Sequence, residues 1–287
     1  MRFIKRINDQ KFTDNQFPPH KNSLYNKQTL TENNNKYFQR LLIFNFNVVN
    51  WARPEDINNE WLYLYNNPDP SDVVQGSIGT CWFLSALASL ANYPNYFSSI
   101  FFAHELSEQG VYQFNLCIRG QLKIVTIDDY LPCNIAKKTV FAGIKNNQLY
   151  AALLEKALAK VHGNFASIIS GYCVEGLQIL TGHPCEIIQL KDKVNEVTEL
   201  ELWNKVKNAF DSAYVMTCLC SYQTSKIRML WNGLFDSHIY SILDVKEFCY
   251  NEEQIRLVKL RNPWGSNGWR GKWWNDLSGK PKFIKGM

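Results

Sequence analysis

The feature that most constrains this chain is an apolar run that begins at a cysteine, directly after a turn containing two glycines. In QGSIGTCWFLSALASL (75–90), Gly76 and Gly79 break the backbone before Cys81, and apolar residues at helical spacing follow. The apolar positions are Trp82, Phe83, Leu84, Ala86, Leu87 and Leu90. We therefore expect Cys81 to stand at the start of a helix.

Further elements follow from periodicity. Alternating residues at 111–118 and 121–128, joined by Arg119-Gly120, predict a hairpin, and helical spacing over 149–161 predicts an amphipathic helix that ends near His162. In the second half the pattern predicts a helix at 199–212 and then strands at 214–221, 238–248 and 254–262. The fold class is thus α+β, with a helix-rich first half and a mostly β second half.

Three regions follow from composition along the chain. Residues 1–40 are polar and rich in Asn, Gln and Lys, which predicts an extended arm with little core of its own, although Phe17-Pro18-Pro19 could dock on a surface. The segment TGHP contains Gly182 and Pro184 and predicts a hinge. We therefore expect a helical subdomain at 41–182 and a β-rich subdomain at 183–287, an arrangement that leaves a cleft between two lobes.

Composition narrows the classes of function. The 287 residues are 46% hydrophobic and 14% aromatic, which excludes a disordered chain. The net charge of +5 is small and its cations are scattered, so nucleic-acid binding is not expected. No apolar run is long enough for a membrane span, and the N-terminus lacks the apolar core of a signal peptide. Eight cysteines without metal-ligand spacing favour a reduced, cytoplasmic setting.

Cys81 is the cysteine whose position suits a nucleophile. Backbone N–H groups and the positive end of the dipole at a helix N-terminus favour a thiolate, and the other seven cysteines have no such placement, Cys133 being expected in a loop after a proline. Gln75 lies six residues earlier across the glycine turn, so its amide could join the Cys81 N–H as a donor to an oxyanion. The alternative for Gln75 is an ordinary surface glutamine, and the alternative for Cys81 is a buried structural thiol.

The base and its orienting group are expected far along the chain. His238 begins a predicted strand, and Asn262 ends the next one; if these strands pair, the two side chains meet. An Asn in that position fixes the tautomer and ring plane of the His. Trp264 could then shield the Asn–His hydrogen bond from water. Taken singly, each residue has an ordinary structural explanation. His238 could be a half-buried strand histidine, Asn262 a loop asparagine before Pro263, and Trp264 a core tryptophan.

These residues and motifs resemble the calpain-type cysteine proteases, a family within the papain-like group. The similarity spans most of the chain. It runs through FTDNQFPPHKNSL, WARPEDI, QGSIGTCWFLSALASL, IDDYLP, ALLEKALAKVHG, GYCVEGLQILTG, SHIYSILDV and LRNPWGSNGWRGKWWNDLS. It implies a papain-like core of two lobes. By match to the family motifs, Cys81 corresponds to the nucleophile, His238 to the general base, Asn262 to the orienting residue, Gln75 to the oxyanion donor and Trp264 to the tryptophan beside the cleft.

The departures from the family pattern concern both the site and calcium. Thr80 stands where the family usually has Asp, and Ser237 and Ile239 where it has Gly and Ala around the histidine. The chemistry requires no cofactor, but the resemblance implies one calcium ion in each lobe as an activator. Asp72 matches one carboxylate of the first site, whereas Gln148 and Gly268 replace acids. Calcium gating of the conventional kind is therefore not expected, and the end at Met287 indicates a truncated or reduced family member.

The sequence thus predicts an intracellular calpain-like endopeptidase that cleaves protein or peptide substrates through a Cys-His-Asn triad and a thioester. The competing hypothesis is a calpain-like interaction or regulatory protein that retains the fold but not the turnover. Other thiol chemistry on a similar core, such as that of a transglutaminase or deubiquitinase, is a more remote alternative. The pattern fixes neither the substrates nor the oligomeric state.

Overall fold

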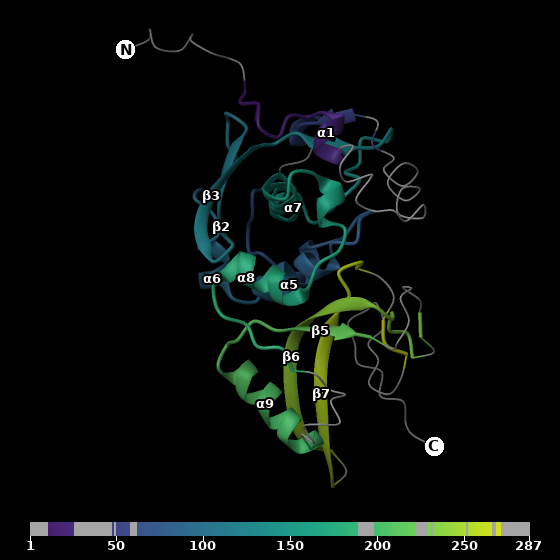
Figure 1. Cartoon of the computed structure of the whole chain (residues 1–287). Helices are drawn as coiled ribbons and strands as arrows, with labels where there is room; N and C mark the ends of the chain where they lie inside the picture. Colours follow the sequence, from purple (N-terminus) through teal and green to yellow (C-terminus); the bar gives the residue numbers. More distant parts are fainter. Residues whose placement is uncertain are drawn as a thin grey trace.

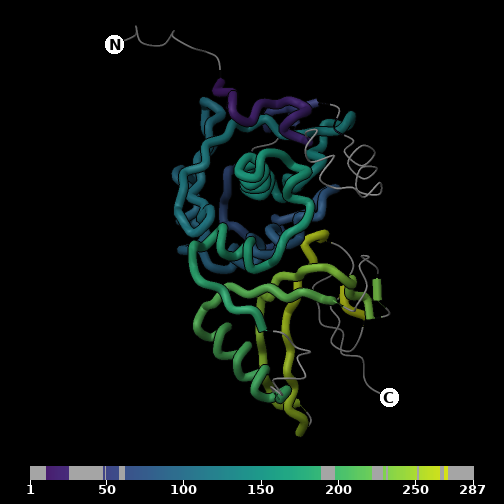
Figure 2. The backbone as a smooth tube through the Cα atoms, in the orientation of Figure 1, coloured from purple at the N-terminus to yellow at the C-terminus, as the bar shows by residue number. Residues whose placement is uncertain are grey.

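The computed structural model places two lobes one above the other, with the chain passing from the first to the second after residue 182 (Figures 1 and 2). The residues that it describes are 11–25, 48, 50–57, 62–188, 198–221, 229–230, 232–250, 252–265 and 268–270. Below, the first lobe means the described residues up to 182, and the second lobe means those after it. Helices and two sheets of two strands build the first lobe, and a three-stranded sheet builds the second, as expected for an α+β fold.

Two buried helices form the centre of the first lobe. α5 (Cys81–Leu90) begins at the predicted cysteine, and all its residues after Cys81 are buried. α7 (Tyr150–Val161) confirms the second predicted helix, and His162 caps its C-terminus. Its prediction as an amphipathic helix was incomplete, because Glu155 and Lys156 are also fully buried.

The remaining elements of the first lobe surround these helices. The predicted hairpin is confirmed: β2 (Val111–Ile118) and β3 (Gln121–Asp128) pair antiparallel over their whole length. A second small sheet joins β1 (Asn50–Ala52) to β4 (Leu131–Cys133), so Cys133 lies in a buried strand and the expectation of a loop there was wrong. The shorter elements are α1 (Lys21–Leu24), α4 (Pro54–Ile57), η1 (Pro70–Asp72), α6 (Pro94–Ser98), η2 (Phe165–Ile168) and α8 (Cys173–Thr181).

The N-terminal segment departs from the expected arm wherever it is described. In residues 11–25, Phe17 and Leu24 belong to the hydrophobic core, and Asp14 is buried. The backbone N–H of Asp14 donates to Asp128, and its carboxylate pairs with Lys160 of α7. Because an unpaired buried carboxylate is costly, the ion pair explains how a polar sequence can dock on the core. The rest of the predicted arm, 1–10 and 26–40, lies outside the described residues.

The motif IDDYLP ties the first lobe together through two buried ion pairs. Lys156 pairs with Asp128 and also donates to the carbonyls of Asp128 and Tyr130. Arg53, from the motif WARPEDI, pairs with Asp129. Each charge has an ionic partner, and further hydrogen bonds satisfy Lys156, Asp128 and Arg53, which is the condition under which ionised groups are tolerated in a core. These acidic residues therefore support the fold rather than line a site.

The second lobe is an antiparallel sheet with strand order β5-β6-β7, flanked by the helix α9 (Glu199–Asp211) (Figure 1). The strands are β5 (Thr217–Cys220), β6 (His238–Tyr250) and β7 (Glu253–Arg261), close to the predicted bounds. The pairing register joins Cys220 to His238 and Ser241 to Arg261, with an irregularity between Ile242 and Asp244. His238 therefore begins the central strand, and the residue after Arg261 emerges beside it.

A polar stripe on α5 joins the two lobes. Ser85 and Ser89, one helical turn apart, donate to the backbone carbonyls of Ile239 and Met216 in the second lobe, at 2.9 and 2.7 Å. In return, Ser241 donates to the carbonyl of Ser85 at 2.8 Å, and Asn92 donates to Leu243. The serines are fully buried, so they hold α5 against the sheet through hydrogen bonds that water does not reach.

α8 ends where the hinge was predicted. Gly182 follows the helix with a left-handed backbone, φ 69°, which a glycine adopts without steric penalty. The chain then runs toward the second lobe without regular structure up to residue 188 (Figure 2). The placing of a domain boundary at this point stays a prediction. Within the described ranges, no helix has the length and apolarity needed to cross a membrane.

Candidate active site

Cys81 is the first residue of α5, and the turn before it is packed too tightly for side chains at its glycines. A Cβ on Gly76 would lie 2.0 Å from the carbonyl oxygen of Phe141, and one on Gly79 would lie 2.4 Å from that of Ile169. Both contacts are with backbone, which cannot move aside as a flexible side chain would. The glycines therefore let the segment from Gln75 to Cys81 lie directly on the first lobe.

The thiol of Cys81 is not an activated nucleophile by itself. Burial raises its pKa above the ordinary value, and the backbone N–H groups of Ile239, Trp82 and Cys81 only partly oppose this. The backbone N–H groups at the helix N-terminus thus do not outweigh the effect of burial on the pKa of Cys81. Ionisation of Cys81 requires a base or a cation close to its sulfur.

His238 lies on the sheet that packs against α5, and its side chain is fully buried. The residue before it, Ser237, has a left-handed backbone with φ 55°. Side chains with a Cβ are disfavoured there, which gives a physical reason for the glycine that the resemblance led us to expect at this position. Ser237 nevertheless adopts the turn that starts β6.

Asn262 holds His238 in one orientation, as the predicted strand pairing required. His238 Nε2 lies 2.8 Å from Asn262 Oδ1, and the same oxygen accepts the backbone N–H of Trp264 at 3.0 Å. Because the amide oxygen can only accept, Nε2 carries the proton, and the lone pair of a neutral ring then resides on Nδ1. Burial lowers the pKa of His238, and the hydrogen bond to Asn262 partly opposes the shift. The ring therefore favours the neutral, basic form.

Trp264 covers this pair. Its ring lies 4.3 Å from that of His238, centroid to centroid, and Phe235 contacts Trp264 at 4.5 Å. Tyr240 meets the His238 ring edge-on at 5.0 Å. The Asn–His hydrogen bond is thus enclosed by aromatic rings, which strengthens it by excluding water.

Gln75 is connected to both lobes. Its backbone N–H donates to the carbonyl of Pro263 at 2.9 Å, and its side-chain Nε2 donates to the carbonyl of Ile78 at 2.6 Å. Its Oε1 is buried and has no hydrogen-bond partner among the described residues. One amide hydrogen is therefore used within the turn and the second remains for another acceptor.

The structure brings the five predicted residues to the junction of the lobes, but it does not join Cys81 to His238 by a hydrogen bond. Within the described ranges, His238 Nδ1 is buried and has no hydrogen-bond partner. Cys81 is nevertheless close to the β6 backbone, because the N–H of Ile239, the next residue after His238, is one of the groups that stabilise its thiolate. Asn262 thus uses Nε2 of His238, and the free lone pair is on Nδ1.

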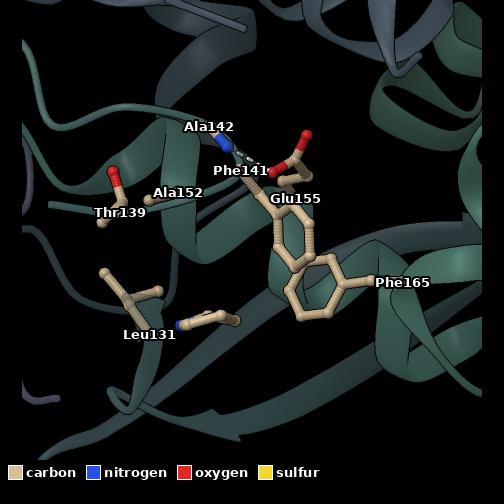
Figure 3. Close-up of a pocket in the computed structure, with 8 residues that line it drawn as sticks. Leu131, Thr139, Phe141, Ala142, Ala152, Glu155 and Phe165 are labelled. Atoms are coloured by element: carbon tan, nitrogen blue, oxygen red, sulfur yellow. Dashed lines mark hydrogen bonds between the residues drawn. The ribbon is translucent and has the colours of Figure 1, made fainter. Parts of the chain in front are cut away.

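Sequence reasoning missed Glu155, which holds the residue before Cys81. Its carboxylate accepts from the hydroxyl of Thr80 at 2.5 Å and from the backbone N–H of Ala142 at 2.6 Å, beside the Phe141 and Phe165 rings of a small pocket (Figure 3). Burial raises its pKa to about 7, despite these two hydrogen bonds. Glu155 lies on the polar side of the 149–161 helical pattern, so the local sequence offered no signal for it.

Asp72, the predicted metal ligand, uses both carboxylate oxygens within the protein. One accepts the backbone N–H of Asp69 at 2.8 Å, in the capping box of η1, and the other accepts the side-chain amide of Asn146 at 2.6 Å. Gln148, in the position of the expected second acid, is paired through both amide atoms with the backbone of Asn66. No cluster of three His, Cys, Asp or Glu side chains suited to a metal occurs among the described residues. The side chains of Asp72 and Gln148 as arranged therefore do not fit a calcium ion.

Two other cysteines, Cys133 and Cys218, and two other histidines, His20 and His162, have surroundings that indicate structural roles. Burial raises the pKa of Cys133 to about 11 and that of Cys218 to about 12, so neither thiol ionises near neutral pH. His20 caps α1, and His162 caps α7. These are structural positions.

Comparison with known proteins places the chain in one family. A profile described as calpain family cysteine protease matches residues 12–282. The chain is 32% identical over 275 residues to the calpain-type cysteine protease DEK1 of Arabidopsis thaliana, covering 92% of this chain and 12% of that protein. It is 29% identical to the calpain-1 catalytic subunit of Rattus norvegicus, covering 91% and 35%, and 29% identical to calpain-5 of Caenorhabditis elegans, covering 93% and 43%. The chain thus spans less than half the length of these relatives.

Proposed function

The chain belongs to the calpain family of cysteine proteases, with a papain-like core, and on this premise we propose that it is a calpain-like endopeptidase whose chemistry is carried by Cys81, His238 and Asn262. One observation supports the proposal above the others. Asn262 fixes His238 through Nε2 under the cover of Trp264, which leaves the basic Nδ1 unpartnered on the strand that packs against the Cys81 helix. A buried histidine with a purely structural role would be expected to use both nitrogens.

In the proposed reaction, His238 Nδ1 accepts the proton of Cys81 and the thiolate attacks a substrate carbonyl carbon. Electrons move to the carbonyl oxygen, and the resulting oxyanion accepts hydrogen bonds from the Cys81 backbone N–H and the second amide hydrogen of Gln75. Collapse of this intermediate breaks the C–N bond, and His238 gives its proton to the leaving amine. Water, deprotonated by His238, then hydrolyses the thioester and releases the acid and the thiol.

Activity in this scheme depends on a short approach of Cys81 to His238. The pKa of Cys81 is raised and that of His238 is lowered, so the neutral thiol and the neutral imidazole are both favoured in the arrangement described. Bringing the two within hydrogen-bond reach would favour the thiolate–imidazolium pair, because each charge then has an opposite partner. We propose that substrate binding promotes this approach.

The test is the rate at which Cys81 reacts with a peptidyl epoxide, followed by mass spectrometry at every cysteine, together with casein hydrolysis. We expect Cys81 to react faster than the other seven thiols, and casein cleavage to be abolished in Cys81→Ser. His238→Ala should slow labelling of Cys81 without affecting the exposed Cys249. Equal reactivity of Cys81 and Cys249 in the wild-type protein would refute the assignment of the nucleophile.

A second candidate is a calpain-like interaction protein without turnover. Two observations favour it. The predicted oxyanion donor Gln75 already donates to Ile78, and no hydrogen bond joins the described Cys81 and His238. This hypothesis predicts the same background signal in the casein assay for wild type and Cys81→Ser. The proposed peptidase predicts a difference between them.

A further inference from the structure

Arg261 reaches from the second lobe to the backbone of the first. It is the last residue of β7 and directly precedes Asn262. Its Nη2 donates to the carbonyl oxygen of Val73 at 2.5 Å and to that of Ser71 at 3.3 Å. These two carbonyls lie on the segment that leads from η1 to Gln75, so the guanidinium spans the junction between the lobes.

The surroundings of this guanidinium are rich in oxygen atoms of the first lobe. Asp69, Asp72 and Tyr150 all favour its charged form electrostatically, although burial by itself lowers the pKa of Arg261. Burial alone would raise the pKa of Asp69, but hydrogen bonds from Ser71 lower it. The charge of Arg261 lowers the pKa of Asp69 further. Nη1 is buried and has no hydrogen-bond partner among the described residues. A half-buried cation whose Nη1 is buried without a partner is retained at a cost, which calls for a role.

Two backbone-directed hydrogen bonds thus hold Asn262 from either side. On one side the preceding residue, Arg261, binds the Val73 carbonyl, and on the other the following residue, Pro263, accepts the N–H of Gln75. Both bonds end on the same short stretch of the first lobe. Asn262 therefore cannot move relative to Gln75 unless one of these links breaks.

We propose that Arg261 is an interlobe positioning residue. Its guanidinium binds the Ser71–Val73 backbone and is the cation that joins the two lobes. This link aligns Asn262 and His238 with the Cys81 segment. Arg261 touches no reacting atom. The proposal agrees with the state of Asp72 and Gln148, whose side chains are already satisfied by protein donors. It rests on the proposed function for its link to catalysis, and it implies that Cys81 reactivity does not require calcium.

The experiment compares Arg261→Ala and Arg261→Lys with Arg256→Ala in the full chain. Arg256 is the matched control, since it lies on the same strand but pairs with Glu247 at the exposed end of the hairpin. We expect labelling of Cys81 to be about 10- to 100-fold slower in Arg261→Ala, because a misplacement of about 1 Å carries a penalty of that order. Arg261→Lys should recover little, since the shorter lysine side chain does not carry its ammonium as far as the position of Nη2. Millimolar methylguanidinium should restore part of the rate in Arg261→Ala and none in Arg256→Ala.

Two further measurements make the outcome decisive. Amide hydrogen exchange at Gln75 reports the bond to Pro263 whether or not the protein is a peptidase, and it should be faster in Arg261→Ala than in Arg256→Ala. Wild-type labelling should be the same in excess chelator and in excess calcium. Unchanged exchange at Gln75 in Arg261→Ala, or loss of wild-type labelling in chelator, would overturn the proposal. Equal reactivity of all wild-type cysteines, with altered exchange at Gln75, would instead refute the proposed function and leave the link between the lobes.

Discussion

At the scale of single residues, the protonation of His238 depends on one acceptor atom. Asn262 Oδ1 accepts from both His238 Nε2 and the Trp264 backbone, so the proton of a neutral ring stays on Nε2. The hydrogen bond is stronger when the imidazole is charged, which is why it raises the pKa that burial lowers. Removing Asn262 therefore changes the basicity of the ring as well as its position.

We predict that Asn262→Ala lowers kcat/KM by roughly 10²-fold or more, a magnitude typical for the loss of organised acid–base catalysis. Its pH profile should change in a defined direction. Without the hydrogen bond the pKa of His238 falls further, so the alkaline limb that reports the thiolate–imidazolium pair moves to lower pH. Initial rates with a fluorogenic peptide across the pH range give this measurement. An alkaline limb that moves upward would contradict the derived tautomer.

Glu155 makes a residue-scale prediction about stability. The pKa of this carboxyl rises from its ordinary 4.5 to about 7 on burial, so the folded protein binds more protons than the unfolded chain between these values. The stability that this group contributes is therefore complete below pH 4.5 and is lost as pH rises through about 7. In Glu155→Gln that contribution is absent.

The difference in unfolding free energy, wild type minus Glu155→Gln, should thus fall by about 3 kcal/mol as the pH rises through this window, and then stay level. Urea denaturation at several pH values measures it. Subtracting the unfolding free energy of Glu155→Gln at each pH removes the contribution of all other titrating groups. A difference independent of pH would show that the pKa of Glu155 is the same in the folded and unfolded states.

At the scale of elements, the Gln75–Cys81 turn fits the first lobe only because its glycines lack side chains. Gly76 lies against the carbonyls of Phe141 and Val140, which belong to the loop before α7. That loop also supplies the N–H of Ala142 to Glu155, whose other oxygen binds Thr80. The start of α5, the glycine turn and α7 thus form one packed unit that sets where Cys81 lies.

Gly76→Ala should destabilise the protein by about 1–3 kcal/mol, because its Cβ would overlap fixed backbone atoms. Gly143→Ala is the matched control: its nearest non-adjacent atom, in Val74, is at an ordinary contact distance of 3.7 Å. Thermal unfolding of both variants provides the measurement. Equal melting temperatures would contradict the packing described.

At the scale of the whole molecule, the lobes meet across buried hydrogen bonds rather than across a purely apolar interface. Ser85 and Ser89 of α5 each bind a carbonyl of the second lobe, and Ser241 binds back to the carbonyl of Ser85. Directional bonds of this kind fix the register of helix against sheet, which area burial alone does not. They hold the Cys81 helix beside the strand that starts at His238.

We predict that the double variant Ser85→Ala/Ser89→Ala loses about 1 kcal/mol for each hydrogen bond and unfolds less cooperatively than the wild type. Scanning calorimetry would show this as a ratio of van't Hoff to calorimetric enthalpy below that of the wild type. Ser99→Ala removes an exposed hydrogen bond to Tyr96 and should have little effect. A double variant as stable and as cooperative as the wild type would contradict the role of the stripe.

The sequence by itself determined most of the longer helices and strands and their order. Apolar periodicity located α5, α7 and the β2–β3 hairpin, since the period of burial is a local property of helices and strands. Strand pairing also brought His238 and Asn262 together, because a hairpin register depends on residues close in sequence. The family motifs then added the pairing of these residues with Cys81.

Only the tertiary structure decided how buried polar groups are satisfied. Glu155, Arg261 and Ser85 gave no distinct local signal, because their partners lie 75, 188 and 154 residues away in the chain. The same holds for Asp14 and Phe17, whose polar surroundings in sequence predicted an arm. In the fold, Asp14 binds α7 and β3, and Phe17 packs on Phe165 of η2. Local pattern measures average hydrophobicity, whereas a buried charge or hydroxyl is tolerated through one specific distant partner, which appears only when the chain is folded.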